Sequence, residues 1–287
     1  MTTASINHTR VGSGEPLVLI HGIGHRWQAW GPVLDRLAAH HEVIAIDLPG
    51  FGQSPPPASG MPAGMPATIE MVISALADFG LDRPHVAGNS LGGAISLELA
   101  AAGAVASATA FSPAGFYTRA ERIRALATLR LLRANTYLPT PVLRAVLRSG
   151  FIRGMSFAPL LAHPRRLDPE RAFGDALALR RARGFETVVR AAREYRFEAG
   201  RLADSTVPVT VGWGDRDRVL GVQQAERVRA ALPHARVVIM PGCGHVPMSD
   251  DPELVANLIL QTTGALPRVD APARQRAEDA PTADERA

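Results

Sequence analysis

A serine with glycines two positions before and two positions after it is the residue of this chain best suited to nucleophilic chemistry. Ser90 lies in Gly88-Asn89-Ser90-Leu91-Gly92, between a short apolar run over 85–87 and a helix-compatible run over 92–102. A G-x-S-x-G sequence between a strand and a helix is typical of a nucleophile elbow, a sharp turn that exposes the serine hydroxyl and leaves room only for small neighbours. Asp217 and His245 follow, each after a predicted strand, and complete a candidate catalytic triad.

The residue types give each member of the triad a role. A free serine is a weak nucleophile, so a base must take its proton as it attacks, and His245 is the predicted base. Asp217 is the predicted acid, which fixes the imidazole tautomer and stabilises the imidazolium. Asp215 competes for this role, but the glycine-x-x-aspartate spacing from Gly214 favours Asp217. The alternative role for Asp215 is that of a turn residue that binds nearby backbone N–H groups.

Two backbone amides are predicted to hold the negative charge that develops on a substrate oxygen. The first is the N–H of Leu91, directly after the nucleophile, and the second comes from the loop after the first buried strand. In that loop, His21-Gly22-Ile23-Gly24, we expect Ile23 to donate, with Gly24 as the second choice. His21 could be a second base, but a histidine in this place more often holds the loop by hydrogen bonds.

Short apolar strands alternate with helix-compatible segments through most of the chain. This alternation predicts an α/β fold with a mostly parallel central sheet and helices on both faces. The expected helices include 27–39 and 68–79, the second with Thr68 as its N-cap. The expected strands are 17–20, 43–46, 85–87, 107–111, 207–211 and 237–240.

One segment interrupts this alternation. Residues 115–204 have no convincing strand and carry Leu, Ala and Arg at helical spacing, so we expect a helical cap inserted into the core domain. The core domain is then formed by residues 1–114 and 205–264. Residues 265–287 combine Ala, Pro and charge with almost no large apolar side chains, and this composition predicts a disordered tail. The cap offers Phe151, Met155, Phe157 and Leu160 as candidates to line an apolar pocket or, alternatively, to pack its core.

The basic residues are unevenly distributed. All 31 are arginines, and the segment 115–204 carries 18 of them against 8 acidic residues, while the whole chain has a net charge of only +4. This asymmetry suggests an acidic substrate or an anionic surface near the segment. The alternative, which we favour, is a set of amphipathic helices with solvated arginine faces.

Other features exclude several classes of function. The chain has no recognised nucleic-acid motif and only 5% aromatic residues, so no nucleic-acid partner is expected. No apolar run approaches the roughly 20 residues of a membrane span. The N-terminus lacks an apolar signal-peptide core, and the single cysteine, Cys243, cannot form an intrachain disulfide, so we expect a cytoplasmic protein. Cys243 has no partners for a metal site, and we expect neither a metal nor a cofactor.

Taken together, these motifs resemble the α/β-hydrolase superfamily, in its branch of capped, single-chain esterases and C–C hydrolases. The resemblance rests on five motifs across residues 17–263: His-Gly-x-Gly from His21, Asp-Leu-Pro-Gly-Phe-Gly-x-Ser over 47–54, the elbow, the acid loop and the histidine loop. The order serine, acid, histidine is that of the superfamily. A serine nucleophile argues against haloalkane dehalogenases and epoxide hydrolases, which use aspartate.

The resemblance leaves the substrate open, because one fold hosts many chemistries. Gly-Asn-Ser-x-Gly-Gly over 88–93 matches meta-cleavage-product C–C hydrolases, but these usually carry tryptophan after the catalytic histidine, where this chain has Val246. We therefore expect a cofactor-free serine hydrolase that cleaves a carboxylic ester of a small to medium apolar substrate. The alternatives are a C–C bond hydrolase and a non-catalytic ligand-binding module. The oligomeric state is left open.

Overall fold

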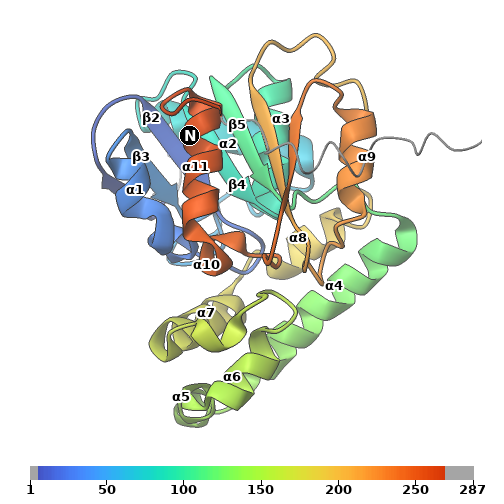
Figure 1. The fold of residues 1–287 in the computed structure, drawn as a ribbon. Helices are drawn as coiled ribbons and strands as arrows, with labels where there is room; N and C mark the ends of the chain where they lie inside the picture. Colours follow the sequence, from blue (N-terminus) through green and yellow to red (C-terminus); the bar gives the residue numbers. More distant parts are fainter. Residues whose placement is uncertain (1–5, 269–287) are drawn as a thin grey trace, which may run out of the picture.

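The computed structural model describes residues 6–268 and is built around one seven-stranded sheet (Figure 1). The strand order is β1-β3-β2-β4-β5-β6-β7, in which β1 is antiparallel to β3 and every other neighbouring pair is parallel. The strands are β1 (His8–Val11), β2 (Pro16–Ile20), β3 (Glu42–Ile46), β4 (His85–Asn89), β5 (Ser107–Phe111), β6 (Val209–Gly214) and β7 (Arg236–Met240). The predicted α/β class is thereby confirmed.

Helices cover both faces of the sheet. Successive residues of β2 point to opposite faces, so Leu17 and Leu19 join one apolar cluster while Val18 and Ile20 join the other. The first face is covered by η1 (Trp27–Val33), α1 (Leu34–Ala38), α10 (Pro247–Asp250) and α11 (Pro252–Thr263). The second is covered by α2 (Met65–Asp78), α3 (Leu91–Ala101) and α9 (Gln224–Ala231).

Two predicted helices are present but differ from the prediction in detail. The segment predicted as one helix over 27–39 begins as the 3-10 helix η1, which contains Pro32, and only continues as α1. Helix α2 begins at Met65, three residues before the predicted cap, because Pro66 suits the first turn of a helix. Its N-cap is Gly64, and Thr68 lies inside the helix, where its hydroxyl donates to the Gly64 carbonyl.

A helical insertion connects β5 to β6. It consists of α4 (Arg119–Ala134), η2 (Asn135–Tyr137), α5 (Thr140–Arg148), α6 (Gly150–Phe157), η3 (Pro164–Arg166), α7 (Pro169–Arg181) and α8 (Phe185–Ala191). Helices α5 and α7 pack around a small apolar cluster of their own, with Leu143, Leu147 and Phe173 at its centre. In Figure 1, α4 to α7 lie together below the sheet, at the edge where β5 ends.

The two ends of the insertion are fixed by different means. Thr118 and Glu121 form a reciprocal capping box at the start of α4. Near the other end, Tyr117 donates to the carbonyls of Ala192 and Tyr195, which follow α8. No helix among residues 6–268 is long and apolar enough to cross a bilayer. Most of the predicted tail, residues 269–287, lies outside the described residues.

Candidate active site

The turn that carries Ser90 is strained and tightly packed. Ser90 has a φ of 57°, a value that residues other than glycine rarely adopt. A Cβ atom at Gly88 would lie 2.1 Å from the carbonyl oxygen of Gly92, and one at Gly92 would lie 2.1 Å from the carbonyl oxygen of Ile20. Both positions therefore require glycine. The steric reason for the G-x-S-x-G pattern is present in the structure, and α3 begins at the next residue, Leu91.

His245 and Asp217 form a buried, hydrogen-bonded pair at the same edge of the sheet. Asp217 Oδ2 lies 2.8 Å from His245 Nδ1, and the two side chains are 0% and 4% exposed. The other carboxylate oxygen of Asp217 accepts the backbone N–H groups of Val219 and Leu220 at 2.9 and 2.8 Å. Because Nδ1 faces the carboxylate, Nε2 is left to accept a proton from another group. Ser90 and His245 line the same cavity.

Asp215 has a different environment. It is exposed, and its Oδ1 accepts the backbone N–H of Gly242 at 2.8 Å, which ties the acid loop to the histidine loop. This is the turn role considered for it from the sequence, and Asp217 is the aspartate that contacts His245. Asn89 supports the same region from the other side, since its Nδ2 donates to the carbonyl of His245 at 2.8 Å and to that of Phe111 at 3.2 Å.

The loop after β2 brings Ile23 to Ser90. A Cβ atom at Gly22 would lie only 3.3 Å from the Ser90 Cβ, so the loop backbone passes close to the nucleophile. His21 holds this loop: its Nδ1 donates to the Gly22 carbonyl at 2.7 Å and its Nε2 accepts the Leu48 N–H at 3.0 Å. Burial lowers the pKa of His21 to about 4, which keeps the ring neutral. His21 therefore has the loop-holding role expected for it.

Leu91 provides the second candidate amide. As the first residue of α3, its N–H is among the four that have no partner within the helix, and the positive end of the helix dipole lies there. Ile23 and Leu91 both line the cavity next to Ser90.

Two largely apolar cavities meet at Ser90, and both are also lined by Ile23 and Leu129. The first, of about 970 Å³ including space open to solvent, is here called the loop lobe. The second, of about 860 Å³ on the same measure, is called the insertion lobe. The loop lobe is lined among others by Leu48, Phe51, Met61, Met65, Met71, Ile95, Tyr117, Arg122, Leu126, Val188 and Tyr195. The insertion lobe is lined among others by His25, Leu132, Leu143, Leu147, Phe157, Leu160, Asp175, Leu179, His245 and Val246.

Of the four candidates for pocket residues in the cap, Phe157 and Leu160 line the insertion lobe. The prediction is wrong for Phe151 and Met155, which point outward and are 64% and 65% exposed. The sequence shows that the four are apolar, but it does not show which of them face the core domain.

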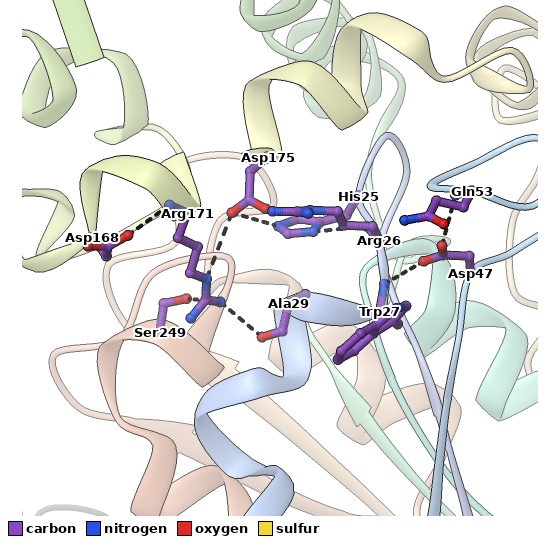
Figure 2. A network of polar contacts seen from close by, with 10 residues as sticks. All are labelled: His25, Arg26, Trp27, Ala29, Asp47, Gln53, Asp168, Arg171, Asp175 and Ser249. Carbon is purple, nitrogen blue, oxygen red and sulfur yellow. Dashed lines mark hydrogen bonds and ion pairs between the residues drawn. The ribbon is translucent and has the colours of Figure 1, made fainter. Parts of the chain in front are cut away.

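A polar network that the sequence did not reveal joins the insertion to the loop of Ile23 (Figure 2). Asp175 of α7 is 8% exposed, and its carboxylate lies 3.1 Å from Arg26 Nε and 3.9 Å from Arg171 Nε. Arg171 also donates to the carbonyl of Ala29 and to the hydroxyl of Ser249, which follows the histidine loop. The network therefore links α7 to the loop of Ile23 and to α10, which directly follows the histidine loop. The only trace of this network in the sequence is Asp175 itself, which lies between apolar residues of α7, four positions after Arg171.

Removal of the Asp175 carboxylate is expected to destabilise the protein. Asp175→Ala leaves Arg26 and Arg171 partly buried without their counter-charge, and loss of one partner of a buried ion pair costs about 3 kcal/mol. Asp168→Ala is the matched control, because Asp168 only caps the same helix from the surface, a contribution of about 1 kcal/mol. Urea denaturation measures both. Equal losses at the two positions would show that the network contributes no more than an ordinary helix cap.

The structure shows no metal site among residues 6–268: no group of three or more His, Cys, Asp or Glu side chains is arranged to hold an ion. Cys243 is buried, and burial raises the pKa of its thiol to about 12. The thiol is therefore protonated near neutral pH, and a protonated thiol is a weak nucleophile.

With this geometry established, comparison with known proteins identifies the family. The chain matches the alpha/beta hydrolase family over residues 17–258, and it belongs to that family. It is a member of an enzyme superfamily of hydrolases whose fold the seven-stranded sheet reproduces.

Individual relatives differ in activity. The chain is 30% identical over 260 residues to Lipase 3 of a Moraxella species, covering 85% of this chain and 76% of the relative. It is 40% identical over 93 residues to the 2-hydroxy-6-oxo-2,4-heptadienoate hydrolase of Pseudomonas putida, covering 31% of this chain and 33% of that enzyme. Among solved structures, a bacterial membrane phospholipase A is 28% identical with a TM-score of 0.72, over 91% of this chain and 82% of that one.

Proposed function

We propose that this protein is a cofactor-free serine hydrolase that cleaves a carboxylic ester with apolar groups on both sides of the bond. The observation that carries the proposal is the position of Ser90, on a strained turn where two apolar cavities meet, beside a histidine that is held by a buried aspartate. Strain of this kind persists where the surrounding structure enforces it, often at catalytic sites. The strain also argues against a ligand-binding module that has lost catalysis.

The proposed reaction proceeds through an acyl-enzyme. Ser90 Oγ attacks the ester carbonyl while His245 takes its proton, and Asp217 stabilises the resulting imidazolium. The amides of Ile23 and Leu91 bind the oxyanion of the tetrahedral intermediate. His245 then protonates the leaving alcohol. In the second half of the reaction it activates water, which releases the acid and restores Ser90.

The lobes support an apolar substrate. Three methionines, Met61, Met65 and Met71, line the loop lobe, and methionine adapts its shape to irregular ligands. The similarity to Lipase 3 and to a phospholipase A supports lipid-like esters as the substrate class. The single unpaired cysteine supports a cytoplasmic location.

Hydrolysis of a carbon–carbon bond in an anionic dienoate is the second candidate. It is favoured by the local similarity to the heptadienoate hydrolase and by Arg122, which lines the loop lobe and could bind a carboxylate. Two observations weigh against it. The first is that the insertion lobe contains the carboxylate of Asp175, which would repel an anionic substrate. The second is that Val246 occupies the position after His245, where the C–C hydrolases usually carry tryptophan.

A panel of p-nitrophenyl esters of increasing acyl length tests the proposal. Each methylene buried in an apolar lobe contributes about 0.8 kcal/mol, so kcat/KM is expected to rise by up to roughly fourfold per methylene until the lobe is filled. Ring-fission dienoates are measured beside the esters. A dienoate cleaved faster than every ester would favour the second candidate, and turnover of neither class would support the binding module.

A further inference from the structure

The outer surface of the helical insertion carries most of the exposed large apolar side chains of residues 6–268. Eight of the ten such side chains lie between residues 123 and 155. Six of them lie on η2, α5, α6 or the two-residue link between η2 and α5. They are Tyr137, Leu138, Val142, Phe151, Ile152 and Met155, with exposed fractions from 38% to 65%. In Figure 1, α5 and α6 form the end of the insertion farthest from the sheet, and residues 137–166 are here called the insertion tip. Clustered apolar exposure of this kind marks an interaction surface.

The charge of the insertion tip has one sign. Residues 137–166 contain five arginines and no Asp or Glu. Arg153 is buried and donates to the carbonyl of Leu147, whereas Arg165 and Arg166 are exposed. Arg144 and Arg148 both reach Glu170 of α7, at 3.0 and 3.7 Å, and the Arg148 side chain is still 68% exposed. The surface thus combines exposed apolar side chains with exposed cations.

This combination favours an anionic lipid surface over a second copy of the chain. A two-fold dimer through the insertion tip would place the same positive patch against itself. At a bilayer that contains anionic lipids, apolar side chains enter the boundary between headgroups and acyl chains, while arginines pair with the headgroups. We propose that the insertion tip docks the protein onto anionic lipid bilayers, lying on the surface rather than spanning it.

The inner side of the same helices connects the insertion tip to the candidate active site. Leu143 and Leu147 of α5 and Phe157 of α6 line the insertion lobe, while Val142, Phe151 and Met155 of these helices point outward. A docked tip therefore places the insertion lobe next to the lipid phase. The docking itself does not depend on ester hydrolysis, so it can be tested separately from the proposed function.

The test is co-sedimentation of the full chain with phosphatidylcholine vesicles, with and without phosphatidylglycerol, in a Ser90→Ala background so that no lipid is consumed. Binding is expected only with phosphatidylglycerol, and it should weaken between about 0.05 and about 0.5 M salt as the Debye length shrinks. Phe151→Ser/Met155→Ser removes apolar contact, and Arg148→Gln/Arg166→Gln removes two cations. Each pair is expected to lower the partition coefficient by roughly tenfold or more.

Matched controls lie on the core domain. Ile73→Ser on α2 removes an exposed apolar side chain, and Arg36→Gln on α1 removes an exposed cation; both are expected to leave binding unchanged. With Ser90 restored, the Phe151→Ser/Met155→Ser variant should hydrolyse a soluble ester at the wild-type rate if the ester proposal is right, and its circular dichroism spectrum should be unchanged in either case.

Three results would overturn the proposal. They are no binding to phosphatidylglycerol vesicles at low salt, equal binding by the tip variants and the wild type, and a dimer in sedimentation velocity that the tip variants dissociate. The last would identify the insertion tip as a self-association surface.

Discussion

Ser90→Ala is expected to abolish ester hydrolysis while the protein remains folded. The hydroxyl carries the proposed chemistry, and loss of a triad nucleophile lowers kcat by roughly 10⁶ in a serine protease. Alanine keeps the Cβ atom that the turn already accommodates, so the strained conformation and the packing of Gly88 and Gly92 are unchanged. Steady-state kinetics with a p-nitrophenyl ester measures the loss.

The control for this variant is its melting temperature, which should lie close to that of the wild type. Ser96→Ala is the matched substitution, because Ser96 is buried in α3 and its hydroxyl donates only to the carbonyl of Gly92. Its activity should stay within a few fold of the wild type. If Ser90→Ala kept more than a tenth of the wild-type turnover, another group would be the nucleophile.

Asp217→Asn is expected to lower kcat far more than Asp215→Asn. An asparagine at position 217 can present its amide N–H to His245 Nδ1 and so favour the wrong imidazole tautomer, a change that costs about 10⁴ in a serine protease. At position 215 the side chain only accepts the Gly242 N–H. An amide oxygen accepts that bond equally well, so this variant should stay within a few fold of the wild type.

Comparison of kcat for the two variants with one ester decides the assignment. Similar losses at both positions, or a larger loss at Asp215, would mean that Asp217 is not the residue that fixes the tautomer of His245 and stabilises its imidazolium form.

Much of the candidate site could be predicted because its constraints are local in the sequence. The small residues around Ser90 are required by atoms within a few residues or on the neighbouring strand, and this requirement leaves a readable pattern. The aspartate and the histidine each follow a strand of the sheet, β6 and β7, and the parallel arrangement brings them to the same edge as Ser90. The distinction between Asp215 and Asp217 followed from their spacing to Gly214.

The features that could not be predicted depend on contacts between distant segments. Strand β1 is short and mostly exposed, so no apolar run marks it in the sequence. It is recognised as a strand only by its antiparallel pairing with β3. The link between Asp175 and Arg26 joins residues that are 149 positions apart. The outward direction of Phe151 and Met155 depends on how α6 packs against its neighbours, which its own periodicity does not specify.

Covalent labelling with a fluorophosphonate tests the central claim most directly, because this probe reacts with an activated serine and reports on the nucleophile without knowledge of the substrate. Intact mass spectrometry of the full chain, followed by peptide mapping, is expected to show one probe adduct, located on Ser90. The adduct should be absent in Ser90→Ala and should form much more slowly in a His245→Ala variant, which lacks the base. No adduct on the folded wild-type protein, or an adduct that persists in Ser90→Ala, would contradict the assignment of Ser90 as the nucleophile of a serine hydrolase.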